Sequence, residues 1–230
     1  MNGASIYEDI GKKIRARRRS LNMTIGELAE ELNKSIPTIS KYESGTVQIG
    51  LDVLLDICRI LRMDIFALLP DTYNEKGDPD VERYQKYFTE KLYVYWYNGE
   101  KDQIQLCVAE NNNLSMRATL YYDAENADDY FSCNYIYSGE IFYSDTSTVW
   151  VFRNQDPPFD TLTLRLPSLS RKGKPRIGLI SCISYFYQSI AMKAIASEAP
   201  INDTEKLKEA LQLSQAELKN IKRTNFLVIW

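Results

Sequence analysis

The spacing of apolar residues changes about a third of the way along this chain of 230 residues. Before residue 70, isoleucine and leucine recur every three or four positions, which is the period of a helix with one buried face. After residue 90, apolar and polar residues alternate in short stretches rich in tyrosine and valine, which is the period of a strand. Only Tyr7 and Tyr42 of the 16 tyrosines precede residue 70, so 14 follow it, together with all three tryptophans. The pattern predicts a helical domain followed by a β-rich domain.

The boundary between the two domains falls in a polar segment with two prolines and a glycine, residues 70–80. This composition is typical of a linker. Val81, Tyr84 and Phe88 then follow at helical spacing and indicate a short connecting helix. The sequence therefore predicts a helical domain at 1–70, a linker with its connecting helix at 71–90, and a β-rich domain at 91–230.

Five short helices are expected in the first domain. Thr24 and Glu27 have the spacing of a capping box, so one helix begins after Thr24. Ser35 is expected to cap the next helix, which has Pro37 in its first turn and ends at Gly45. Apolar stripes indicate the other three helices, with Ile6, Ile10 and Ile14 in the first, Leu51, Leu54, Leu55, Cys58 and Leu61 in the fourth, and Ile65, Leu68 and Leu69 in the fifth. Five short helices with tight turns predict a helix-turn-helix bundle.

Eight strands are expected in the second domain, at residues 92–97, 104–109, 118–122, 130–137, 140–143, 149–153, 161–166 and 176–185. Their meandering order favours a small antiparallel barrel or a strongly curled sheet. A late helix is expected over residues 203–223, and residues 226–230 are expected to return as an edge strand. The fold class is therefore α+β with two domains. Whether the interior of a barrel holds a small ligand or is filled by side chains stays open.

The residue composition argues against an enzyme. The chain has no histidine, which excludes histidine-based acid–base catalysis, a Ser-His-Asp triad and histidine metal ligands. The four cysteines are too far apart for a Cys-x-x-Cys motif and are expected to be buried thiols. The sequence contains no run of 18 apolar residues and no signal peptide, so a cytoplasmic protein with no membrane partner is expected. We therefore expect no catalytic residue, no metal and no cofactor.

The net charge of −3 is unevenly placed along the chain. Residues 1–70 hold ten basic and nine acidic residues, a net of +1, and the rest of the chain holds 18 and 22, a net of −4. Six basic residues fall within eight positions, namely Lys12, Lys13, Arg15, Arg17, Arg18 and Arg19. Such a run is often a solvated helix face, but beside a DNA-reading helix it favours a surface that faces phosphates.

Residues 24–45 resemble a known DNA-binding motif. The first helix of the motif carries a Leu-Ala pair and has the sequence Thr24-Ile25-Gly26-Glu27-Leu28-Ala29-Glu30-Glu31-Leu32. The second helix carries an isoleucine that is expected to be buried and ends in Glu-x-Gly, with the sequence Ser35-Ile36-Pro37-Thr38-Ile39-Ser40-Lys41-Tyr42-Glu43-Ser44-Gly45. The segment is similar to the Cro and phage-repressor type of domain in the Xre family of bacterial regulators, over residues 6–69. The resemblance implies a transcriptional regulator that binds double-stranded DNA.

In such a domain the second helix lies in the major groove and presents the outward side chains of its first turns to the bases. The residues expected there are Ser35, Ile36, Pro37, Thr38, Ser40 and Lys41. Helix N-termini at Thr24 and Ser35 offer backbone amides to phosphate, and the basic residues expected to assist them are Lys12, Lys13, Arg15 and Arg19. The resemblance also implies a buried ion pair between Arg18 and Glu43, the alternative being that both are solvated.

The chain departs from the family pattern in two places. Ile25 stands where members often carry a phosphate-binding glutamine, and the loop Thr46-Val47-Gln48-Ile49 lacks the usual lysine or arginine. A single domain is therefore expected to bind DNA weakly, so we expect a homodimer on an inverted-repeat operator. The late helix offers a dimer seam of Leu207, Leu211, Ser214, Leu218 and Ile221, although this stripe could instead pack on its own barrel.

Two functions agree with these features. The first is a repressor whose C-terminal domain dimerises and senses a small ligand. The second is an antitoxin-like or phage-defence regulator whose C-terminal domain binds a partner protein. The sequence does not decide between repression and activation, and it does not identify the operator or the ligand.

Overall fold

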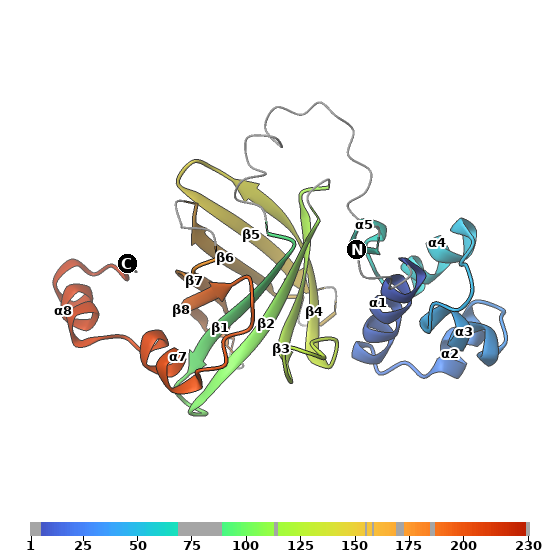
Figure 1. Ribbon diagram of the computed structural model, residues 1–230, viewed down its shortest axis with the longest axis horizontal. Coiled ribbons are helices and arrows are strands. Elements are labelled where there is room, and N and C mark those ends of the chain that lie inside the picture. Colours follow the sequence, from blue (N-terminus) through green and yellow to red (C-terminus); the bar gives the residue numbers. More distant parts are fainter. Residues whose placement is uncertain are drawn as a thin grey trace.

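The computed structural model describes residues 6–68, 89–112, 115–154, 156–157, 159–168, 173–184 and 187–228. A bundle of short helices lies beside a β-barrel, and two further helices lie on the opposite side of the barrel (Figure 1). The predicted linker and connecting helix, residues 71–90, lie almost wholly outside the described residues.

The first domain contains five helices, α1 (Ile6–Ser20), α2 (Ile25–Glu31), α3 (Ile36–Glu43), α4 (Leu51–Ile60) and α5 (Ile65–Leu68). Their shared core includes Ile14, Leu28, Ile39 and Leu61, each at most 1% exposed. Gly11 allows α1 to approach α3, because a Cβ at this position would lie 2.5 Å from the carbonyl oxygen of Tyr42. The five-helix bundle predicted from the apolar stripes is confirmed.

The second domain is a closed barrel of eight antiparallel strands, in the order in which they occur along the chain. The strands are β1 (Lys91–Asn98), β2 (Gln103–Asn112), β3 (Arg117–Ala124), β4 (Cys133–Tyr143), β5 (Ser147–Asn154), β6 (Thr161–Pro167), β7 (Arg176–Ile183) and β8 (Ser189–Ser197). Strand β8 closes the barrel against β1, with Tyr93 opposite Ser197 and Trp96 opposite Ala194. The barrel alternative of the sequence prediction is therefore confirmed.

Side chains fill the barrel interior. Alternate residues of all eight strands form one buried cluster, which includes Leu92, Cys107, Leu120, Tyr137, Trp150, Leu164, Ile180 and Ala194. The indole nitrogen of Trp150 donates to Oδ1 of Asn111 across this interior at 2.8 Å, which satisfies a polar group away from water. Of the two alternatives left open by the sequence, the structure favours a packed core.

The prediction of two strands at 130–137 and 140–143 was wrong, because β4 runs without a break from Cys133 to Tyr143. Ser138 and Gly139 fall between the two predicted strands, yet Gly139 lies within β4 opposite Phe152 of β5. A Cβ at Gly139 would lie 2.3 Å from the carbonyl oxygen of Val151. The glycine is there for the close approach of β5 and not to reverse the chain.

The end of the predicted strand pattern was also wrong. The expected strand 176–185 is β7, which ends at Ile183, and β8 (Ser189–Ser197) was not predicted. Residues 226–228 form no strand, and the last two residues lie outside the described part of the chain. The edge that those residues were expected to cover is instead closed by β8.

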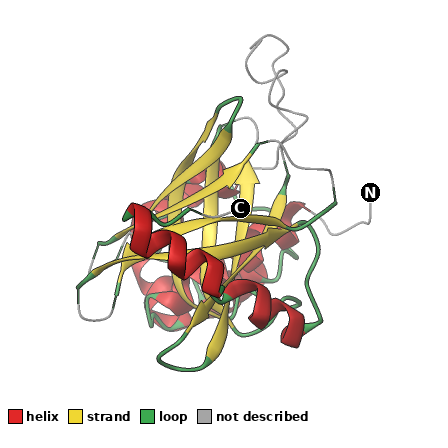
Figure 2. Ribbon diagram, turned by 90° about the vertical axis from the view of Figure 1, so that its left-hand side faces the viewer, coloured by secondary structure: helices red, strands yellow, loops and turns green. Residues whose placement is uncertain are grey.

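The predicted late helix is divided into α7 (Thr204–Leu211) and α8 (Gln215–Thr224), which cross the outside of the barrel (Figure 2). Ser214 ends the continuity of the helix because its hydroxyl caps α8 in a capping box with Glu217. Leu207 and Leu211 pack on Tyr95 and Ile195 of the barrel. These two leucines therefore belong to the core of their own chain and not to an exposed seam.

The first domain packs on the outside of the barrel through α1. Ala16 lies in a buried cluster with Val108, Tyr121, Tyr130 and Ile136, which project outward from β2, from β3, from the β3–β4 connection and from β4. The helices α2 and α3 lie on the far side of α1 from the barrel (Figure 1). Among the described residues, no helix is long and apolar enough to cross a membrane.

Candidate nucleic-acid interface

The helices α2 and α3 begin with side-chain caps. Thr24 accepts a hydrogen bond from the Glu27 amide at 3.2 Å, and the Glu27 carboxylate accepts from the Thr24 amide at 2.7 Å. These hydrogen bonds from Thr24 lower the pKa of the Glu27 carboxyl. Ser35 accepts from the Thr38 amide at 3.3 Å, and the hydroxyl oxygens of these two residues lie 2.8 Å apart. The caps fix where each helix begins and hold both N-termini at the surface.

The outward face of α3 is open to solvent. Ser35, Ile36, Pro37, Ser40 and Lys41 are exposed. Ile36 is 52% exposed although it is apolar. On the opposite face, Ile39 and Tyr42 are buried in the domain core. The structure therefore presents the residues predicted to read bases on one free face, with Thr38 half-buried at its margin.

Arg18 and Glu43 form a buried ion pair between α1 and the end of α3. The Arg18 guanidinium donates from Nε to Oε1 at 2.6 Å and from Nη2 to Oε2 at 2.9 Å. A third hydrogen bond runs from Nη1 to the carbonyl oxygen of Met23 at 2.7 Å. Only 9% of Arg18 and 6% of Glu43 is exposed, so the pair fixes α3 to α1 and is unavailable to DNA.

The basic run of α1 divides into two groups. Lys12, Arg15 and Arg19 are exposed, and their spacing of three and four residues places them along one stripe of the helix. Lys13, Arg17 and Arg18 are held in contacts with other parts of the chain. Three residues of the run are thus free to face a phosphate backbone, and the other three form ion pairs within the chain.

Lys13 was predicted to contact DNA, but the structure turns it toward the barrel. Its ammonium lies 3.5 Å from Glu110 of β2 and 3.1 Å from Asp9, and it donates to the carbonyl oxygen of Ala67 at 3.1 Å. Burial alone would lower the pKa of Lys13, but the charges of Glu110 and Asp9 raise it above its ordinary value. In this arrangement the Lys13 charge is neutralised within the chain.

Contacts between the domains include two further ion pairs that were not predicted from the sequence. Arg17, which is 2% exposed, pairs with Asp156 beyond β5 at 2.6 Å and donates from Nε to the carbonyl oxygen of Leu61 at 2.8 Å. Asp64, between α4 and α5, pairs with Arg117 of β3. The partners are 53 and 139 residues apart along the chain, so no spacing pattern could have revealed them.

Over the described ranges, no three histidine, cysteine, aspartate or glutamate residues converge in a way that could bind a metal ion. Cys58 and Cys107 are buried, whereas Cys133 and Cys182 are half-buried, and all four are free thiols.

Comparison with known proteins gives a match for the first domain. The family model described as Helix-turn-helix matches residues 14–68. An uncharacterized HTH-type transcriptional regulator of Sinorhizobium medicae (strain WSM419) and the regulator R00410 of Rhizobium meliloti (strain 1021) are each 34% identical to this chain over 68 residues. That segment covers 30% of this chain and 49% of each relative, so the chain spans about half the length of the curated relatives it matches.

Similar solved structures give weaker matches. The clp gene regulator ClgR from C. glutamicum is 24% identical, with a TM-score of 0.28 over 29% of this chain and 86% of its own. The structure of FeII HppE is 14% identical, with a TM-score of 0.29 over 84% of this chain and 98% of its own. TM-scores of this size support no conclusion about shared function. The family match and the geometry of α2 and α3 agree, and the first domain is a helix-turn-helix domain of the Xre type.

Proposed function

We propose that the chain is a sequence-specific DNA-binding transcriptional regulator and that α3 is its reading helix. The observation that carries the proposal is the exposed N-terminal face of α3, where Ser35, Ile36, Ser40 and Lys41 have no cover from the barrel. A helix in the major groove contacts base edges through this part of its surface. The capped N-termini of α2 and α3 add backbone amides that can contact phosphate oxygens.

The chemistry of α3 limits what it reads. Lys41 donates hydrogen bonds and suits guanine, whose major-groove edge carries two acceptors, and Ser40 donates or accepts. Ile36 and Pro37 have no side-chain donor, and the methyl group of thymine is the apolar feature that they suit. The expected operator half-site therefore contains both a guanine and a thymine contacted by α3.

Repression is the regulatory effect that we propose. Occupying promoter DNA is enough to block transcription, whereas activation needs a further surface that contacts the polymerase. We also propose that the chain acts without enzymatic activity, because no histidine is present and its four thiols are held with raised pKa values by burial.

A homodimer is the form that we propose to bind DNA. One reading helix covers one half-site, and residues 24–50 carry only Lys34 and Lys41 as basic residues. The helix α8 offers a surface for a second copy, because no residue of α8 is buried and its Leu218 is 37% exposed. Its neighbours Leu213 and Phe226 are 38% and 68% exposed.

The test is selection of DNA fragments by the full chain, followed by footprinting of the selected site. The expected result is protection of an inverted repeat with half-sites about 10 base pairs apart between centres, one turn of the duplex. Binding should weaken steeply as salt is raised, because phosphate contacts release counterions. Retention of all fragments with equal affinity would refute sequence-specific binding.

A further inference from the structure

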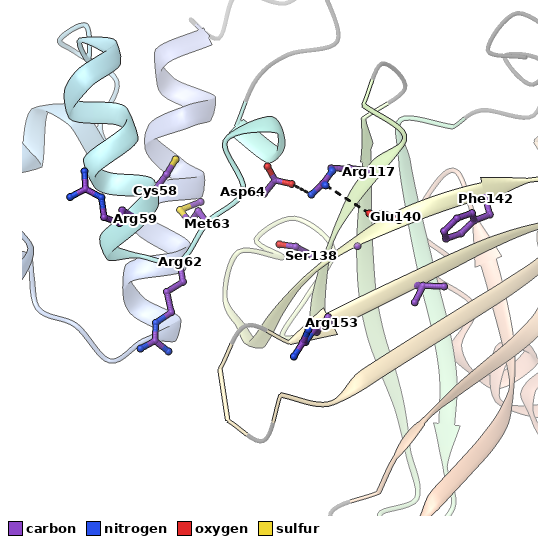
Figure 3. A pocket seen from close by; sticks show the side chains of 12 residues that line it. Cys58, Arg59, Arg62, Met63, Asp64, Arg117, Ser138, Glu140, Phe142 and Arg153 are labelled. Atoms are coloured by element: carbon purple, nitrogen blue, oxygen red, sulfur yellow. Dashed lines mark hydrogen bonds and ion pairs between the residues drawn. The ribbon is translucent and has the colours of Figure 1, made fainter. Parts of the chain in front are cut away.

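A cleft lies between the two domains, with one wall from each. Its volume is about 570 Å³, which is in the range of sites for small organic ligands. The wall from the first domain is the turn between α4 and α5, with Arg62 and Asp64, and the wall from the barrel comes from β3, β4 and β5 (Figure 3). A cleft with walls from two domains is a common location for a ligand site.

Positive charge dominates the cleft. Its lining holds four arginines against two carboxylates, Asp64 and Glu140. Arg117 is already paired with both carboxylates, with Asp64 at close range and with Glu140 at 3.8 Å. The fourth arginine, Arg59, is paired with Asp56 on its own helix. Within the described part of the chain, neither Arg62 nor Arg153 has a side-chain hydrogen bond or an ion pair, and both are exposed. The cleft therefore carries two uncompensated guanidinium groups, one on each wall (Figure 3).

The backbone gives no reason for an arginine at position 62. Arg62 has a φ of +51°, a left-handed conformation that the chain adopts elsewhere in this domain at Asn22, Asn33 and Gly45. Glycine and asparagine suit such a turn, whereas a long side chain is disfavoured there. The side chain of Arg62 also contributes nothing to the core, since it is exposed. Neither the backbone conformation nor the core therefore accounts for the arginine, which lines the cleft.

The barrel wall adds an apolar surface beside these charges. Phe142 on β4 is 52% exposed and Val151 on β5 is 37% exposed, although both are large and apolar. Val151 pairs with Glu140, two residues before Phe142 on the same strand. A ligand that covers this surface and reaches the arginines needs an apolar body and an anionic group.

We infer that the cleft binds a small amphipathic anion, with an aromatic or aliphatic body on Phe142 and Val151 and a carboxylate, phosphate or sulfonate group between Arg62 and Arg153. Planar guanidinium groups suit these oxyanions because they donate paired hydrogen bonds. The two arginines belong to different domains, so the bound anion would link the helix-turn-helix domain to the barrel. If the chain regulates transcription as proposed above, such a ligand would set the position of the reading helix.

The experiment uses the fluorescent probe 8-anilinonaphthalene-1-sulfonate, which has an aromatic body and one sulfonate. The full chain is titrated with the probe and compared with the double variant Arg62→Gln, Arg153→Gln. We expect at least about a tenfold weaker affinity in the double variant, because each hydrogen bond to a charged group contributes roughly a factor of ten. The control is Arg165→Gln, an exposed barrel arginine outside the cleft lining, which should bind the probe like the parent.

Two results would overturn the inference. One is equal affinity of the parent and the double variant, which would mean that the probe binds an apolar patch only. The other is hydrogen exchange in which the probe protects β4 and β5 but not the segment 59–64, because the anion would then touch one wall. The site is supported if the probe protects both walls from hydrogen exchange and if the double variant binds the probe more weakly than the parent. The measurements need no DNA, so failure of the proposed regulatory function would leave them unaffected.

Discussion

Arg17 of α1 and Asp156 beyond β5 are joined by two hydrogen bonds across the boundary between the domains. Nη1 donates to Oδ2 at 2.6 Å and Nη2 to Oδ1 at 3.3 Å. Arg17 is almost fully buried, since only 2% of it is exposed, so the Asp156 carboxylate is the counter-charge of a guanidinium that water does not reach. This pair, with Lys13–Glu110 and Asp64–Arg117, holds the helix-turn-helix domain on the barrel.

Asp156→Asn should loosen the contact between the domains. The substitution leaves the buried guanidinium of Arg17 without a counter-charge, which costs on the order of 3 kcal/mol. We expect a lower unfolding midpoint in urea and a larger radius of gyration by X-ray scattering. The control is Asp128→Asn, an exposed carboxylate of the β3–β4 connection that has no ion pair among the described residues. Scattering and unfolding curves identical to those of the parent would show that the pair does not hold the domains together.

Arg18→Ala should destabilise the first domain, and not merely weaken DNA binding. Glu43 would remain buried without its partner, at a cost of about 3–5 kcal/mol. The double variant Arg18→Met, Glu43→Leu removes both charges and should recover much of the loss. Thermal unfolding, monitored by circular dichroism, measures the stability of the single and the double variant. A double variant as unstable as Arg18→Ala would mean that the loss comes from packing and not from the uncompensated carboxylate.

Ser40→Ala with Lys41→Ala should abolish the preference for a selected operator while leaving the fold intact, because both side chains are exposed. Each lost base contact should cost about 1–3 kcal/mol of binding free energy. Gel-shift titrations against operator and random DNA measure the loss. Lys101→Ala, a charge change in the β1–β2 turn, is the control. Unchanged operator preference in the double variant would place the reading surface elsewhere.

The cysteines should react slowly in the native protein. Burial raises the pKa of the Cys58 and Cys182 thiols to about 11, with nearby carboxylates at Asp64 and Asp160 adding to the effect. At pH 8, a thiol of pKa 11 is ionised to about one part in a thousand, against about a quarter for a free cysteine. Labelling with a thiol reagent at pH 8 should therefore be slow until denaturant is added, and rapid labelling of the native protein would contradict these values.

The raised thiol pKa values should also make the stability of the folded protein depend on pH. The thiol pKa is higher in the folded protein than in the unfolded chain, so the folded state holds its protons more tightly. The contribution of these groups to stability is present below about pH 9 and is lost as the pH rises toward 11. Urea unfolding at pH 8 and pH 10.5 measures the loss, and Cys58→Ser should reduce it.

Local signals explain why the first domain could be predicted from the sequence. Capping residues, a left-handed glycine and apolar stripes act over three or four residues, and Thr24, Ser35 and Gly45 lie where those signals placed them. The eight strands expected before the late helix equal the number in the barrel, but through two errors that cancel. Gly139 divided one strand into two, and β8 was missed because its burial follows no strict alternation.

Contacts between distant parts of the chain could not be predicted in the same way. Lys13 and Arg17 look like Lys12 and Arg15 in the sequence, yet the first two face carboxylates of the barrel and the others face solvent. Which face of α1 meets the barrel depends on the packing of Ala16 against Tyr121, and on no motif. The cleft between the domains could not be predicted from the sequence either, because the residues of its two walls are 53 or more positions apart along the chain.

The chain should form a symmetric dimer through α8. Leu207 and Leu211 are buried on the barrel and cannot serve a second copy, whereas Leu213 before α8 and Leu218 within it remain more than a third exposed. Leu213→Lys with Leu218→Lys places two charges in this surface and should convert a dimer to a folded monomer by light scattering. Leu55→Lys, an exposed leucine of α4, is the matched control and should leave the dimer intact.

Loss of the dimer should also be visible on DNA. Two reading helices about 34 Å apart contact both half-sites together, whereas a monomer contacts only one. The double variant should therefore lose affinity for the full inverted repeat but retain the affinity of the parent for a single half-site. A parent chain that is strictly monomeric at micromolar concentration would refute the dimer, and a double variant that stays dimeric would move the interface from α8 to the barrel.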